Sequence, residues 1–279
     1  MAAIAAYPEL SCKGKPGSPR IVWGVEDIVL CPGKEDMFRF LEDVFREMVP
    51  LFPGKYFHIG GDECPKVSWK NCPACQKRIQ NEDLQADGKH SAEERLQSYV
   101  IRRMEKLFAQ YGKKIIGWDE ILEGGVSRTA TVMSWRGTKG GIEAAKLGND
   151  VIMTPSDYYY LDHFQTADPV KNKEPLAIGG YTSLKKSYSF DPFDQLTDYE
   201  SQFIKGIQCN LWTEYIPDYK QAQHMLLPRL AALSEVAWSN FHRTSYDQFV
   251  ERVETSLLPL YDSAEYNYAD YAFQNPPIE

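Results

Sequence analysis

The sequence has few cysteines, no excess of basic residues and no long apolar run. Six cysteines in 279 residues are too few to hold the fold together through disulfides. The formal net charge of −8 gives none of the positive surface that nucleic acid or an anionic membrane requires, so neither is an expected partner. No apolar stretch reaches the roughly 18 residues of a membrane span, and the opening residues lack the pattern of a signal peptide. These absences leave a globular protein with 43% hydrophobic and 25% charged residues.

Three of the cysteines, Cys64, Cys72 and Cys75, lie close together in the sequence. Two residues separate Cys72 from Cys75, which is the gap of a metal-binding knuckle. A tetrahedral site needs a fourth ligand, however, and the nearest candidates, His58 and His90, have no recognisable ligand spacing. The pattern therefore favours a disulfide or buried thiols that brace a loop over a structural zinc site.

Apolar residues recur every three or four positions in four segments, which predicts a helix in each of them. The short apolar runs between these segments are too brief for helices and predict strands. Strands that alternate with helices are typical of parallel β–α–β units. The expected helices are 34–49, 91–111, 219–238 and 246–258, and the expected strands are 56–59, 114–117, 131–134, 151–154 and 207–211.

Aromatic or acidic residues follow each expected strand. In a (β/α) barrel the carboxyl ends of all strands meet at one catalytic face, whereas a doubly wound sheet brings only some of them together. The pattern therefore favours an α/β fold of the TIM-type (β/α)8 class, of which about five βα units are recognisable, as a single catalytic domain over residues 1–279. The residues that this barrel would place at one mouth are Asp62, Glu63, Trp118, Trp135, Tyr160, Asp162, Trp212 and Glu214.

Tryptophans and carboxylates at one mouth suit a carbohydrate ligand. Indole rings stack on the apolar faces of a sugar, and carboxylates accept hydrogen bonds from its hydroxyls. Asp62 and Glu63 are neighbours, so they could hardly bracket an anomeric carbon from both sides, as the two carboxylates of an ordinary retaining glycosidase do. They could instead do separate jobs, with Glu63 protonating the glycosidic oxygen and Asp62 holding a group on the sugar. On the dipeptide alone, a solvated turn is the simpler interpretation.

The strings at these strand ends resemble the motifs of family 20 glycoside hydrolases, the β-N-acetylhexosaminidases. The first is HIGGDE at 58–63, and GWDE at 117–120, SWRG at 134–137, YLD at 160–162 and LWTE at 211–214 come after it in the family's order. The resemblance implies a barrel fold and a glycan substrate from which a terminal β-linked N-acetylhexosamine, GlcNAc or GalNAc, is removed. It also implies a secreted or periplasmic location and a chemistry without a metal or an organic cofactor.

The resemblance further implies a retaining, substrate-assisted mechanism, in which the sugar's own 2-acetamido oxygen attacks the anomeric carbon to form an oxazolinium intermediate. Glu63 is then the general acid and base, Asp62 accepts a hydrogen bond from the acetamido N–H, and Tyr160 donates one to the acetamido oxygen. This account requires a buried Glu63 beside a cage of indoles, with its pKa raised by burial and by Asp62. The implied walls of the acetyl pocket are Trp118, Trp135 and Trp212, and the implied ligands of the hydroxyls at carbons 4 and 6 are Asp162 and Glu214.

The family's first three strands have no counterpart in this sequence, whose opening residues resemble the segment after the third strand in family members. The chain is therefore expected to be truncated at its N-terminus. An open sheet exposes two edges, so self-association through them or marginal stability is expected. Three functions stay open: an active exo-acting β-N-acetylhexosaminidase, a catalytically silent fragment that at most binds N-acetylhexosamine weakly, and a metal-dependent protein organised around the cysteines.

Overall fold

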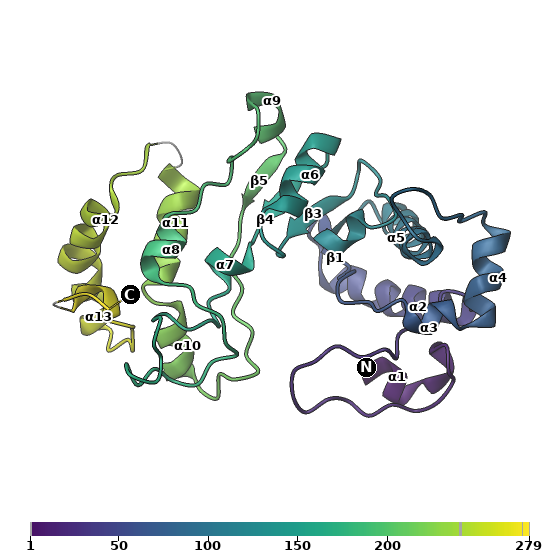
Figure 1. Cartoon of the computed structure of the whole chain (residues 1–279), viewed down its shortest axis with the longest axis horizontal. Coiled ribbons are helices and arrows are strands. Elements are labelled where there is room, and N and C mark those ends of the chain that lie inside the picture. Colours follow the sequence, from purple (N-terminus) through teal and green to yellow (C-terminus); the bar gives the residue numbers. More distant parts are fainter. Residues whose placement is uncertain (1, 240–241, 275, 279) are drawn as a thin grey trace. The chain divides into compact units, whose positions relative to one another are not determined.

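The computed structural model describes residues 2–239, 242–274 and 276–278, and the chain divides into two compact units (Figure 1). The first unit comprises Met1–Met133 and Glu143–Asp150, and the second comprises Ser134–Ile142 and Val151–Glu279. Across the described ranges, none of the helices combines the length and the apolar character that crossing a bilayer demands. The single domain expected over 1–279 stays a prediction.

The first unit contains parallel strands that pair in sequence order. Tyr56 of the first strand lies opposite Lys114 of the second, and Ile116 of the second lies opposite Thr131 of the third. These strands are β1 (Tyr56–His58), β2 (Lys114–Trp118) and β3 (Thr131–Ser134), the last ending at the boundary of the unit. The helices are α1 (Ala2–Ala6), α2 (Glu35–Leu51), α3 (Val67–Lys70), α4 (Pro73–Asn81) and α5 (Ala92–Gln110), with 3₁₀ turns η1 (Pro8–Leu10) and η2 (Asp119–Leu122), while α6 (Lys139–Leu147) is divided between the units.

Aromatic packing holds α2 and α5 against the strands of the first unit. Phe57 of β1 stacks on Phe108 of α5 with ring centroids 4.8 Å apart, and Phe45 of α2 lies 4.6 Å from Phe108. Ser91 begins α5 through a capping box with Glu94, in which each side chain bonds to the other's backbone amide. Burying a ring of this size contributes about 1.5–3 kcal/mol to stability, so these contacts stabilise the packing of both helices against β1.

The second unit combines two parallel strands with a layer of helices. The strand β4 (Val151–Met153) pairs with β5 (Ile204–Ile207), with a register shift after Val151. A core of Leu184, Tyr188, Ala232, Phe249 and Val253 lies among its helices. These are α7 (Ser156–Tyr159), α8 (Leu184–Tyr188), α9 (Asp198–Ser201), α10 (Tyr219–Leu226), α11 (Arg229–Ser239), α12 (Tyr246–Arg252) and α13 (Leu258–Ser263), together with the π-helical turn η4 (Val253–Leu257) and the 3₁₀ turn η5 (Tyr271–Phe273).

The structure corrects the predicted elements in three places. The segment 219–238 forms α10 and α11 instead of one helix, because Pro228 has no amide hydrogen to continue the first. Pro50 lies inside the last turn of α2 and does not end that helix. The last strand is 204–207 and not 207–211, because residues after it bond to the segment beyond β4, where the Asn210 amide donates to the Tyr159 carbonyl at 2.9 Å. The other predicted strands and helices are confirmed within a few residues.

Candidate active site

The acidic pair lies on a tight turn directly after β1. Gly60 and Gly61 have positive φ values of 72° and 99°, a conformation that glycine adopts without a steric penalty. A Cβ atom on Gly61 would lie only 2.7 Å from Cγ2 of Ile121, so the turn packs closely against η2. Glu63 itself has a φ of 45°, which is uncommon for a residue with a side chain. The two glycines thus set the path of the chain that presents Asp62 and Glu63 at the carboxyl end of β1.

The Glu63 side chain is exposed within the first unit, which corrects the expectation of a buried acid. The physical reason is that the neighbouring indole does not cover it: the ring of Trp118 packs on His58, with centroids 4.8 Å apart. The pKa of Glu63 is nevertheless raised, first by the partial desolvation of its carboxyl group and second by the negative charge of Asp62. The direction agrees with the sequence-based expectation and keeps Glu63 protonated to a higher pH than a free glutamate.

His58 braces this turn from the end of β1. Its Nδ1 accepts a hydrogen bond from the Gly60 amide at 3.1 Å, which requires that this nitrogen carry no proton. Desolvation lowers the pKa of His58, and the charge of Asp62 opposes that effect without reversing it. This hydrogen bond therefore joins the His58 side chain to the backbone of the turn.

A cluster of rings lies after β3, β4 and β5 in the second unit. Trp135 and Tyr160 are nearly parallel, at 13° with centroids 6.0 Å apart, and Tyr160 meets Trp212 at 62° with centroids 6.2 Å apart. Trp212 is 41% exposed, so part of its surface is open to a ligand. Three of the predicted sugar-binding rings therefore lie side by side, in an arrangement that suits the apolar face of a sugar or an acetyl methyl group.

Asp162 is a buried carboxyl group beside these rings, with only 3% of its surface exposed. Desolvation raises its pKa to about 6, although the backbone amides of Asp162 and Trp212 bond to it and act in the opposite direction. The charge of Glu214, which is itself exposed, also raises the pKa of Asp162. Among the described residues, Oδ1 of Asp162 has no hydrogen-bond partner. Such an atom is costly unless a ligand or water supplies the missing donor, so Asp162 has the features of a binding group.

Arg229 holds the loop that carries Asp162 in place through hydrogen bonds to its backbone. No pattern in the sequence indicates this role. The guanidinium is fully buried and donates hydrogen bonds to the carbonyl oxygens of Leu161 at 2.6 Å, His163 at 3.1 Å and Thr182 at 2.9 Å. Desolvation lowers the pKa of Arg229 to about 9. An arginine in an amphipathic helix is normally a surface residue, and only the tertiary structure shows that this one fixes the Asp162 loop.

The predicted site residues divide between the two units. The first unit holds two neighbouring acids on a turn, and the second holds a group of aromatic rings and a buried acid. The first unit holds Asp62, Glu63 and Trp118, and the second holds Trp135, Tyr160, Asp162, Trp212 and Glu214.

The sequence matches a known enzyme family over most of its length. The profile described as glycosyl hydrolase family 20, catalytic domain, matches residues 1–241. The β-hexosaminidase of Porphyromonas gingivalis is 47% identical over 262 residues, which cover 93% of this chain and 33% of that protein. The β-hexosaminidase of Vibrio furnissii is 34% identical over 238 residues, which cover 84% of this chain and 38% of that protein. The chain therefore spans about a third of the length of these curated relatives.

Solved structures show the same fold. The family 20 exo-β-N-acetylglucosaminidase of Vibrio harveyi, solved in complex with N-acetylglucosamine, has a TM-score of 0.80 and 28% identity, with 96% of this chain and 41% of that chain covered. The N-acetyl-β-hexosaminidase of Streptomyces plicatus, in complex with Thio-NAglucal, has a TM-score of 0.77 and 28% identity, with 96% and 49% covered. These matches confirm the α/β fold with parallel strands that the sequence predicted. With its profile match and its identity to the curated relatives, the chain belongs to glycosyl hydrolase family 20.

Proposed function

We propose that this chain is part of a β-N-acetylhexosaminidase that removes a terminal β-linked N-acetylhexosamine from a glycan. Membership of the family and the names of its relatives support the general activity. The observation that carries the proposal is the raised pKa of Glu63 beside Asp62 on the turn after β1. A general acid must still hold its proton near the working pH, and a raised pKa meets that requirement.

In the proposed reaction, Glu63 donates its proton to the glycosidic oxygen. The acetamido oxygen of the sugar forms a bond to the anomeric carbon as the glycosidic bond breaks, and Asp62 accepts a hydrogen bond from the acetamido N–H. The negative charge of Asp62 stabilises the positive charge that develops on the oxazolinium ring. Water then attacks the anomeric carbon and gives a proton to Glu63 as the bond between that carbon and the acetamido oxygen breaks, which restores the acetamido group with retention of configuration. No nucleophile from the protein is needed, which fits two acids that are neighbours in the sequence.

The second unit supplies groups that suit the sugar itself. The hydroxyl of Tyr160 donates a hydrogen bond to the acetamido oxygen. Asp162 and Glu214 bind the hydroxyls at carbons 4 and 6, and a sugar hydroxyl gives Oδ1 of Asp162 a donor in place of water. Trp135 and Trp212 of this unit line the acetyl group and the sugar face, and Trp118 of the first unit keeps the wall role that the resemblance implies.

Hydrolysis of chromogenic N-acetyl-β-glucosaminide and N-acetyl-β-galactosaminide tests this function. In Glu63→Gln, kcat is expected to fall about 10²- to 10⁴-fold, the usual contribution of a placed general acid. Binding of a thiazoline mimic of the oxazolinium ring should persist in this variant. Glu47→Gln is the matched control because Glu47 is an exposed acid on α2, and its turnover should equal that of the wild type. Equal turnover of Glu63→Gln and the wild type would refute the role of Glu63.

The exposure of Glu63 favours a second candidate function, an N-acetylhexosamine binder without turnover. A proton donor open to water has less of the desolvation that sustains acid catalysis. Calorimetry with N-acetylglucosamine, run beside the chromogenic assay, separates the two functions. Binding without hydrolysis supports the binder, and the absence of both contradicts both candidates.

A further inference from the structure

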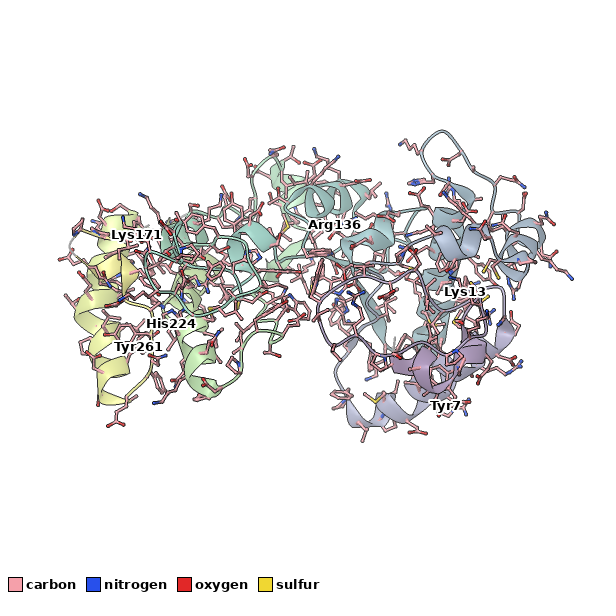
Figure 2. The ribbon with its side chains drawn as sticks, turned by 60° about the horizontal axis from the view of Figure 1, so that its bottom comes forward. Tyr7, Lys13, Arg136, Lys171, His224 and Tyr261 are labelled. Carbon is pink, nitrogen blue, oxygen red and sulfur yellow. The ribbon has the colours of Figure 1, made fainter. Side chains whose placement is uncertain are left out.

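Four cysteines of the first unit bring their sulfur atoms together outside the candidate active site. The Sγ atoms of Cys12, Cys31, Cys72 and Cys75 all lie within 4.8 Å of one another. Cys31 is 3.5 Å from Cys75, and the pairs Cys12–Cys75 and Cys31–Cys72 are each 3.7 Å apart. In Figure 2 sulfur atoms lie close to the label of Lys13, the residue after Cys12. Cys64, which the sequence grouped with Cys72 and Cys75, is not a member of this tetrad.

The sulfur separations fit a tetrahedral metal site and not a pair of disulfides. A disulfide joins two sulfurs at about 2.05 Å, whereas all six cysteines here are free. Cys31 and Cys75 each contact two other sulfurs, and the contact between them is the shortest of the three, so the sulfurs form one connected group. Four sulfurs at about 2.3 Å from a central ion form a tetrahedron with edges of about 3.8 Å. The three shortest separations in the tetrad are close to that edge.

Two of the four cysteines, Cys72 and Cys75, lie at the start of α4. Cys72 is the N-terminal cap of this helix, Pro73 is its first residue and Cys75 lies in its first turn. The fixed φ of proline suits the first helical position, which presets the spacing of the two cysteines.

The second pair reaches the site from the segment before α2. The Cys31 amide donates to the Leu10 carbonyl at 2.8 Å, which aligns the chain beside Cys12 with the chain at Cys31. A Cβ atom on Gly33 would lie 2.3 Å from the carbonyl carbon of Ala74, so the turn after Cys31 is pressed against the backbone between Cys72 and Cys75. Only glycine permits this approach, and the approach brings the two pairs of sulfurs together.

The tetrad lies in an apolar interior. Cys31 and Cys75 are fully buried and Cys72 is 6% exposed. Trp69, Ile79, Leu84 and Leu96 pack around them, with Cys12 at the partly buried edge. Thiolate sulfur selects soft ions, and a tetrahedral set of four is the donor set of structural zinc. A divalent cation also removes the repulsion among four thiolates in such surroundings.

We propose that Cys12, Cys31, Cys72 and Cys75 bind one zinc ion in a closed, structural site. Binding forms four zinc–sulfur bonds and releases one proton from each thiol. Four protein ligands leave no position for water, so this ion has no part in the hydrolysis proposed above. It ties the segment before α2 to the start of α4, and the chain between β1 and α4 carries Asp62 and Glu63. The site therefore anchors the downstream end of the region that carries the acidic turn.

Metal analysis of the full chain tests this site. The protein is purified under reducing conditions without a chelator, incubated with zinc sulfate, desalted and analysed by mass spectrometry for elements. One zinc per chain is expected, released by a mercurial thiol reagent and accompanied by a lower melting temperature after release. Cys31→Ser should lose the zinc, whereas Cys64→Ser and Cys209→Ser should retain it because these cysteines lie outside the tetrad. Retention of zinc by Cys31→Ser would overturn the assignment.

A second measurement uses the wild type alone, because Cys31→Ser alters a fully buried residue and can unfold the chain. Replacement of zinc by cobalt should give the intense visible absorption of a tetrahedral site and a thiolate-to-metal charge-transfer band. A weak octahedral spectrum would contradict the proposal. Absence of bound zinc after incubation, disulfides among the four cysteines of reduced and freshly purified protein, or binding of iron in preference to zinc would each overturn it as well.

Discussion

Two effects raise the pKa of the Glu63 carboxyl group. Desolvation disfavours its charged form, and the charge of Asp62 does the same at short range. The Glu63 carboxyl group is therefore protonated at low pH and stays so through a range in which a free glutamate is ionised. If Glu63 is the proton donor proposed above, its activity is expected below the raised pKa and is lost as the pH rises through it.

Asp62→Asn should move the alkaline limb of the pH profile to lower pH. The substitution removes the negative charge that contributes to the raised pKa of Glu63, so the acid loses its proton earlier in an alkaline titration. The dependence of kcat/KM on pH, measured with a chromogenic N-acetylhexosaminide, gives the position of this limb independently of the overall loss of rate. Glu47→Gln should leave the limb unmoved. A limb that stays in place or moves upward in Asp62→Asn would contradict the electrostatic coupling.

Asp162→Asn should stabilise the protein at neutral pH. Burial raises the pKa of Asp162 from 3.8 to about 6, so the folded state binds the proton more tightly than the unfolded chain. The contribution of this group to stability is present below pH 3.8 and is lost as the pH rises to about 6, after which it is constant. The loss amounts to as much as about 3 kcal/mol, at about 1.4 kcal/mol per pH unit.

Denaturant unfolding from pH 4 to pH 7 measures this effect. The asparagine variant should lack the fall in unfolding free energy that the wild type shows over this interval, and it should bind N-acetylglucosamine more weakly. Asp247→Asn is the control, because Asp247 is exposed on α12 and its replacement should preserve the wild-type slope. If the unfolding free energy changed equally with pH in the wild type and in Asp162→Asn, the buried carboxyl group would not be the source of the pH dependence.

The loop after β4 depends on a helix that comes much later in the chain. Arg229, the first residue of α11, bonds to carbonyl oxygens on both sides of Asp162 and also to the Met225 carbonyl at the end of α10. One side chain therefore satisfies several buried backbone acceptors that no regular element could reach. The conformation of this loop is a property of α10 and α11 as much as of its own sequence.

Arg229→Met should destabilise the second unit by about 3–5 kcal/mol, because it leaves several buried carbonyl groups without a donor at nearly constant side-chain length. Thermal and denaturant unfolding measure the loss. Arg39→Met is the control, because the side chain of Arg39 is 67% exposed and pairs only with Asp36 on the same helix. Its effect should stay within about 0.5 kcal/mol. A loss below about 1 kcal/mol in Arg229→Met would mean that water replaces the guanidinium.

At the scale of the whole molecule, the strands at the ends of the sheet order leave hydrogen-bonding edges. Among the described residues no strand pairs with the outer side of β1, where Tyr56 is 45% exposed. Leu51 and Phe52, just before this strand, are 69% and 53% exposed. An uncovered edge next to apolar side chains is a template for pairing with another chain. The self-association expected from the sequence therefore has a defined place in the first unit.

Tyr56→Lys should reduce that association. A charge on an edge strand disfavours pairing with a second copy, since the lysine would be desolvated in the interface. Sedimentation velocity over a range of protein concentrations should show association of the wild type and a shift toward monomer in the variant. Tyr219→Lys, which alters an exposed tyrosine on α10, serves as the control. A monomeric wild type at all concentrations would contradict this use of the edge.

The sequence predicted the parts of the molecule that are encoded locally. The five motifs identified the family, and the spacing of apolar residues over 91–111 predicted α5 to within one residue at each end. Features that depend on contacts between residues far apart in the sequence could not be predicted. Cys12 and Cys75 are 63 residues apart in the sequence, so no spacing rule connects them. The burial of Arg229 and the exposure of Glu63 are likewise set by packing and by the path of the turn, which periodicity does not describe.

The left-handed backbone of Glu63 has an evolutionary consequence. A glutamate with a φ of 45° costs the folded chain roughly 1–2 kcal/mol that a glycine at the same position would not. The proton transfer proposed for Glu63 gives a reason for keeping a glutamate here against its own conformational preference. In lineages that abandon glycan cleavage but keep the fold, drift toward glycine or asparagine at this position is expected to precede loss of the surrounding strand.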